Sequence, residues 1–141
     1  MINSIGIVGN GSIGRRHHAI IKELYPSVKR VIIKSNMSRK RTTENSFSIS
    51  DAIKIGIEAA IIASPASLHI EHALKLIKHK VPLLIEKPLS HNLNQIDELE
   101  KIKNQKNTLV LIGYCLRYDL SAKRFFDIIK RTNYKDKKSL S

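Results

Sequence analysis

The sequence has few of the residues that secreted and membrane proteins depend on. Among its 141 residues there is one cysteine, Cys115, and no tryptophan. A single cysteine excludes an internal disulfide and fits a reducing compartment, so we predict a cytoplasmic protein. No apolar run approaches the roughly 20 residues that span a bilayer, and no basic segment precedes the short apolar stretch at the N-terminus. We therefore expect neither membrane association nor a signal peptide.

Acidic residues are also scarce, because 25 Lys and Arg face only 12 Asp and Glu, for a formal net charge of +13. Such a charge favours acidic partners, and nucleic acid is the first candidate. Aromatic residues make up only 5% of the chain, however, and no row of them alternates with the positive charges. Stacking on single-stranded nucleic acid needs such a row. We favour a solvated basic surface and keep nucleic-acid binding as the weaker alternative.

With a single cysteine in the chain, a metal site would depend on histidines and carboxylates. Five of the six histidines show no ligand-like spacing with carboxylates or with the cysteine: His17, His18, His72, His79 and His91. We therefore predict no metal site. His17 is expected to pack near the glycine-rich segment that precedes it.

Apolar strand-like runs alternate with amphipathic helix-like stretches along the chain. The apolar runs are continuous, which is typical of parallel strands covered on both faces. We predict an α/β fold, a doubly wound parallel sheet (Rossmann fold), as a single domain over residues 1–131, and a polar, basic, disordered tail over 132–141. Expected strands are 3–9, 28–35, 57–64, 81–86 and 108–114; expected helices are 12–26, 48–56 with Ser50 as N-cap, 67–80, 93–105 and 120–131.

Three glycines follow the first expected strand with the spacing G-x-G-x-x-G. Gly9 permits a tight turn, Gly11 lets a pyrophosphate approach the backbone, and Gly14 lets helix and strand pack closely. The helix that begins at Ser12 and Ile13 presents free N–H groups to phosphates. A plain glycine turn is the alternative, but it does not explain why all three spacings occur together. The segment therefore predicts dinucleotide binding.

The end of the second expected strand carries cations where an NAD-binding chain usually carries an acid. No Asp or Glu lies between Glu23 and Glu44, and Lys34, Ser35 and Arg39 stand there instead. Cations with a hydroxyl would hold a 2′-phosphate that a carboxylate would repel. This favours NADP over NAD. The alternative is a basic loop that only faces solvent.

Two later segments make the pattern specific. The stretch "ASPASLHIEHALKLIKHKVPLLIEKPLS" carries a proline, a histidine four residues on, a helix, a strand and then Glu-Lys-Pro, and "GYCLRY" ends the next strand. With the glycine loop, the chain resembles the N-terminal domain of the glucose-fructose oxidoreductase / inositol dehydrogenase / MocA (Gfo/Idh/MocA) family from residue 2 to about residue 130. The resemblance implies NAD(P)-dependent hydride transfer, often at a hydroxyl-bearing carbon of a sugar or cyclitol.

The resemblance also implies site residues. Lys87 matches the lysine beside the nicotinamide and the reacting hydroxyl, where it can polarise a carbonyl or join a proton relay, so it is the candidate catalytic residue. Glu86 would contact the nicotinamide-ribose end or orient Lys87. The other matched positions are Ala63, Ser64, Pro65 and His69 for the cofactor, and Tyr114 and Arg117 for the substrate. The alternatives are an exposed strand-end lysine for Lys87, a helix-start polar residue for His69, and a surface cation for Arg117.

The chain departs from the family pattern in length. The family continues into a second α/β domain with an open antiparallel sheet, which supplies much of the substrate pocket and commonly a further catalytic residue. We therefore expect cofactor binding with little or no activity alone. A truncated product, half of a split enzyme completed by a partner chain, and a non-catalytic NADP-binding or scaffold module all stay open. Apolar residues on the uncovered flank, around Phe125, Phe126 and Ile129, predict self-association. Leu120 also stands where the family often has proline.

Overall fold

The computed structural model describes residues 2–35 and 46–132. Within them, six parallel strands form one sheet in the order β3-β2-β1-β4-β5-β6. The strands are β1 (Ser4–Val8), β2 (Lys29–Ile33), β3 (Ser46–Phe47), β4 (Ala59–Ile62), β5 (Leu83–Ile85) and β6 (Val110–Ile112). The helices are α1 (Ser12–Leu24), α2 (Ile49–Lys54), α3 (His69–Ile77), α4 (Ile96–Lys106) and α5 (Leu120–Thr132), with 3₁₀ turns η1 (Ala66–Leu68) and η2 (Cys115–Arg117). This strand order confirms the predicted doubly wound Rossmann fold.

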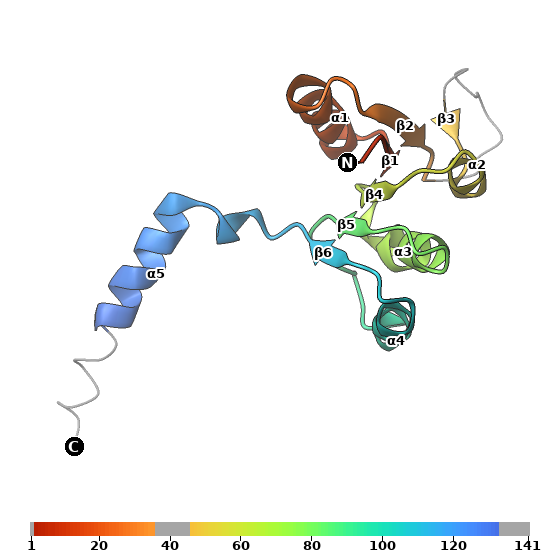
Figure 1. Ribbon diagram of the computed structural model, residues 1–141. Coiled ribbons are helices and arrows are strands. Elements are labelled where there is room, and N and C mark those ends of the chain that lie inside the picture. Colours follow the sequence, from red (N-terminus) through yellow and green to blue (C-terminus); the bar gives the residue numbers. More distant parts are fainter. Residues whose placement is uncertain (1, 36–45, 133–141) are drawn as a thin grey trace.

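The strands form where the sequence has short β-branched runs, and their side chains alternate between two cores. Val8, Ile33 and Ile62 are fully buried and lie in the larger core with α2, α3 and α4. Ile7 and Ile61 point to the opposite face and pack with Ile21 of α1. Each such side chain contributes about 1.5–3 kcal/mol by its burial. Figure 1 shows α1 on one side of the sheet and α2, α3 and α4 on the other.

Among residues 2–35 and 46–132, helices cover only one face of the β6 end of the sheet, although the continuous apolar run of this strand indicated cover on both faces. In Figure 1, α5 projects away from the sheet, and it packs mainly against η2. Leu111 on β6 is 52% exposed as a result. Phe125 and Phe126 on α5 are 59% and 56% exposed, and their rings meet edge to face with centroids 5.8 Å apart. The predicted apolar flank is thus confirmed at these two residues, while self-association stays a prediction.

Several boundaries differ from the sequence-based expectations. Ser48, not Ser50, caps α2: its Oγ accepts from the Asp51 N–H at 3.1 Å, and the Asp51 carboxylate accepts from the Ser48 N–H at 3.3 Å. This capping box satisfies two N–H groups at the helix start, whereas Ser50 is exposed inside the helix. The two-residue strand β3 was not predicted, because it is too short to give a periodic signal. The helix α4 begins at Ile96 rather than at residue 93, because the backbone of Gln95 is in the left-handed region, with φ 60°.

Two expectations fall on segments that the structure does not describe. The basic loop that includes Arg39 lies in residues 36–45, and most of the expected C-terminal tail lies in residues 133–141. Thr132, the first residue of that tail, instead ends α5.

Candidate functional site

The glycine loop joins β1 to α1, and its three glycines meet different surroundings. Gly9 has a φ of +100°, and a Cβ there would lie 2.7 Å from the Ala63 carbonyl oxygen. A Cβ on Gly14 would overlap the carbonyl oxygen of Gly9. A Cβ on Gly11, by contrast, would meet no atom of the described residues within 4 Å. Gly9 and Gly14 are therefore required by the fold, whereas Gly11 only leaves space above the loop.

The first turn of α1 offers backbone N–H groups to that space. Gly11 is the N-cap and supplies no side-chain hydrogen bond, and the first turn carries no acidic residue. Ser12 and Ile13, the first two helical residues, are exposed. An uncapped helix start combines orphan N–H donors with the positive end of the helix dipole. This geometry suits a phosphate or another anion.

A cavity of about 140 Å³ opens beside the loop, at the carboxyl ends of β4 and β5. Apart from Ala66, its lining consists of residues that the sequence analysis selected: Ile13, Ala63, Ser64, His69, Glu86 and Lys87. Lys87 is exposed, and the Lys87–Pro88 peptide bond is cis. Pro65, the remaining predicted residue of this loop, is exposed next to the cavity wall. The predicted nicotinamide-end residues are therefore one cluster in space.

The end of β2 lies at the same edge of the sheet. The Lys34 N–H donates to the Phe47 carbonyl at 3.0 Å, which ties this end to β3. Ser35 follows and is half-buried. In a doubly wound sheet a ligand lies across the carboxyl ends of the strands. Lys34 and Ser35 therefore lie at this edge of the sheet, while Arg39 lies outside the described residues.

Two buried histidines connect the loops around the cavity. His69, 2% exposed, places Nε2 at 2.8 Å from the Ser64 carbonyl oxygen and Nδ1 at 2.9 Å from the Pro88 carbonyl oxygen. His72, 3% exposed, places Nδ1 at 2.9 Å from Ser64 Oγ and Nε2 at 3.1 Å from the Ser35 carbonyl oxygen. The sequence analysis selected His69 but assigned no role to His72, because no local pattern distinguishes it.

A hydrogen bond from α1 holds Glu86 from the other side of the loop. His17 Nε2 on α1 lies 2.7 Å from Glu86 Oε1, and both side chains are about 20% exposed. The Lys87 N–H donates to Glu86 Oε2 at 3.3 Å. The sequence analysis placed His17 near the glycine loop but missed this pair. Helical spacing puts His17 on the same face of α1 as Gly14, but it does not indicate Glu86, 69 positions away, as the partner.

The two predicted substrate residues lie in a second, open cavity of about 480 Å³ along β5, β6 and η2. Tyr114 and Arg117 line it together with His17, Glu86 and Leu111. Since Glu86 lines both cavities, the predicted substrate residues lie next to the cavity that contains Lys87.

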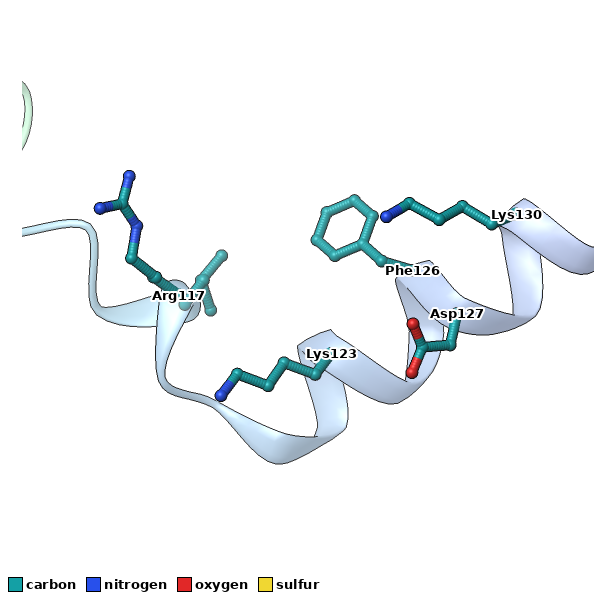
Figure 2. A pocket seen from close by; sticks show the side chains of 6 residues that line it. Arg117, Lys123, Phe126, Asp127 and Lys130 are labelled. Carbon is teal, nitrogen blue, oxygen red and sulfur yellow. The ribbon is translucent and has the colours of Figure 1, made fainter.

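A third cavity, of about 450 Å³, lies between η2 and α5. Figure 2 shows Arg117 on η2 and, on α5, Lys123, Lys130 and Asp127 around the ring of Phe126. Because α5 projects away from the sheet in Figure 1, this cavity is remote from the glycine loop. It shares Arg117 with the second cavity, and its other lining residues lie outside the candidate site.

Residues 2–35 and 46–132 form neither a metal-binding cluster nor a membrane-spanning helix. There, no three His, Cys, Asp or Glu side chains come close enough together to hold a metal ion. None of the helices in that part of the chain is both long and apolar enough to cross a membrane.

Comparison with known proteins identifies the family of this chain. A family model described as "Oxidoreductase family, NAD-binding Rossmann fold" matches residues 3–114. Myo-inositol 2-dehydrogenase of Thermotoga maritima is 23% identical over 134 residues, which are 89% of this chain and 40% of that protein. Glucose-6-phosphate 3-dehydrogenase of Bacillus subtilis is 28% identical over 123 residues, 83% of this chain and 35% of that protein.

Solved structures show the same fold. Scyllo-inositol dehydrogenase of Lactobacillus casei, solved with bound NAD(H) and scyllo-inositol, has a TM-score of 0.75 at 20% identity and covers 96% of this chain and 43% of that chain. This chain thus spans 35–40% of the length of the curated relatives it matches. The family model matches well over half of the chain. The chain therefore belongs to the Gfo/Idh/MocA oxidoreductase family, which has an NAD-binding Rossmann fold.

Proposed function

We propose that this chain binds NAD(P) across the carboxyl ends of β1, β2, β4 and β5. The observation that carries the proposal is the contrast within the glycine loop. Gly9 and Gly14 pack against backbone, while Gly11 leaves open space in front of an uncapped helix start. If the glycine loop served only to reverse the direction of the chain, it would not need open space at Gly11. A pyrophosphate does need it, since its oxygens must approach the N–H groups.

The residues around the loop fit the rest of a dinucleotide. The Ser12 and Ile13 N–H groups would donate to the pyrophosphate. Lys34 and Ser35, with Arg39, would hold a 2′-phosphate on the adenosine ribose, so we propose NADP rather than NAD as the preferred cofactor. The cavity of Ala63, Ser64, Pro65 and His69 would border the nicotinamide half.

We further propose that the chain contributes this cofactor to an oxidoreductase acting on a sugar or cyclitol. The relatives named above are inositol and sugar-phosphate dehydrogenases. When bound, the nicotinamide would supply or accept the hydride. Lys87 would hydrogen-bond the substrate oxygen and exchange its proton, and Glu86, fixed by His17, would hold Lys87 beside it. Tyr114 and Arg117 would contact the substrate from the second cavity.

A complete substrate pocket needs more protein than the matched span provides. The second cavity is open, and the relatives are more than twice as long as the segment they share with this chain. We propose that a second domain or a partner chain covers the cavity and completes the enzyme. The single exposed cysteine and the absence of a disulfide partner for it fit a reducing, cytoplasmic setting.

Calorimetric titration of the 141-residue chain with NADPH and then with NADH tests the proposal. We expect binding of both, with NADPH tighter. Circular dichroism first establishes that the sample is folded. A folded chain that binds neither cofactor would refute dinucleotide binding, and equal affinities would refute the NADP preference alone.

A further inference from the structure

We propose that His72 is a positioning residue for the adenosine end of the cofactor site, because it fixes the end of β2 relative to the loop after β4. The inference rests on the proposed function, since its main readout is cofactor binding. His72 itself lies beneath the site and is not proposed to touch the cofactor.

The contacts of His72 define its tautomer. Burial lowers the pKa of His72 below its ordinary value of 6.5, against the opposing effect of its bond to the Ser35 backbone. The ring is therefore neutral near pH 7 and carries one N–H. The Ser35 carbonyl can only accept, so Nε2 carries the hydrogen and donates it at 3.1 Å. Nδ1 then accepts from the Ser64 hydroxyl at 2.9 Å.

This arrangement joins two segments that are not neighbours in the chain. Ser35 lies 37 residues from His72, at the end of β2, and Ser64 lies 8 residues from it, at the end of β4. The side chain is 3% exposed, so water cannot easily replace either bond. Loss of the ring would leave a carbonyl and a hydroxyl to be satisfied in other ways. The end of β2 would keep its main-chain bond to β3 but lose its link to the loop after β4.

The connection continues to the other half of the site. The Ser64 carbonyl also meets His69 Nε2, and His69 Nδ1 meets the Pro88 carbonyl next to Lys87. The path Ser35–His72–Ser64–His69–Pro88 therefore runs from the adenosine end to the nicotinamide end. His72 is the member that reaches the adenosine end, so its loss should affect that end selectively.

Two substitutions separate the two bonds of His72. The amide nitrogen of His72→Gln reaches about as far as Nε2 and keeps the donor to the Ser35 carbonyl. The shorter side chain of His72→Asn keeps an acceptor for the Ser64 hydroxyl but cannot reach Ser35. Ile77→Ala is the matched control, because Ile77 is fully buried at the opposite end of α3 and tests general loosening of this helix.

The experiment measures the affinity of each variant for NADPH, for adenosine 2′,5′-bisphosphate and for nicotinamide mononucleotide. We expect His72→Asn to weaken NADPH and the bisphosphate about fivefold, the effect of one net hydrogen bond, and to leave the mononucleotide unchanged. His72→Gln should stay within about twofold of the unsubstituted chain, a difference much smaller than one net hydrogen bond. Ile77→Ala should lower the melting temperature without changing the ratio of the two fragment affinities.

A second measurement needs no cofactor and no variant. Imidazole nitrogen chemical shifts from NMR should show His72 neutral at pH 7 with its hydrogen on Nε2. The opposite tautomer would overturn the proposal, and so would indistinguishable fragment affinities of His72→Asn and His72→Gln. If the unsubstituted chain binds no dinucleotide, the proposed function fails, and the positioning role fails with it. If it binds but the variants do not differ, only the positioning role fails.

Discussion

The most direct test of the candidate site is the substitution Gly11→Ala. In the glycine loop, a Cβ at this position meets no atom of residues 2–35 and 46–132 within 4 Å. The backbone is also permissive, because Gly11 has φ −73° and ψ −171°, which any residue adopts. The added methyl group therefore enters only the space that we assign to the pyrophosphate.

The magnitudes follow from this geometry. For folding, alanine is a poorer N-cap than glycine by up to about 1 kcal/mol, but it reduces the freedom of the unfolded chain by about 0.4–1 kcal/mol. The two effects offset each other, so we expect the free energy of unfolding to change by less than about 1 kcal/mol. For binding, displacement of one phosphate oxygen from a backbone N–H removes a charge-assisted hydrogen bond of about 1.5–3 kcal/mol, or about 10- to 150-fold in affinity.

The assay compares urea unfolding with NADPH titration for three variants. Gly11→Ala should lose affinity while it keeps its stability. Gly14→Ala should lose stability, because its Cβ would overlap the Gly9 carbonyl oxygen. Gly56→Ala, remote from the loop at the end of α2, has φ +76° and should cost about 1 kcal/mol of stability without any change in affinity. A folded Gly11→Ala chain with unchanged affinity for NADPH would refute the placement of the pyrophosphate at this loop.

Four further outcomes are expected. Alanine at Lys34 and Arg39 together should weaken NADPH more than NADH in calorimetry, and equal losses would contradict a 2′-phosphate contact. Ser48→Ala should lower the free energy of unfolding by about 1 kcal/mol in urea titration, because it removes the N-cap of α2, and no change would mean that the capping box contributes nothing. Because the pKa of His72 is lowered in the folded state, the unfolded chain takes up this proton first, so stability should fall as the pH drops below 6.5. Above that pH, the contribution of His72 to the free energy of unfolding should not change with pH. His72→Gln should remove this contribution to the pH dependence of stability. Sedimentation of the full chain should show self-association that Phe126→Ser reduces, and a monomer at high concentration would contradict that expectation.

Local sequence signals were sufficient for the fold and for the loop. The apolar runs that became β1, β4 and β5 are short, continuous and bounded by glycine, proline or charge, so their assignment as parallel strands needed no tertiary information. The glycine spacing between Gly9 and Gly14 is likewise local. The Glu86–Lys87 cluster was found only through the resemblance, because nothing in its own composition marks a strand end as a site.

The remaining features depend on contacts between distant residues. His17 and Glu86 are 69 positions apart, and His72 and Ser35 are 37 apart, so no periodicity could pair them. The uncovered edge beside β6 shows the same limit. The amphipathic pattern around Phe126 predicts a helix, which the structure confirms as α5, but it cannot specify the surface against which that helix packs.

The open turn at the start of α1 has a consequence for how this chain can vary. We assign the pyrophosphate to main-chain N–H groups, and nearly every amino acid supplies the same group. An exposed position such as Ser12 can therefore change its side chain freely over generations while the ligand contact persists. Only proline, which lacks the hydrogen, would remove the contact there. The glycines are the opposite case, since their role is to have no side chain at all.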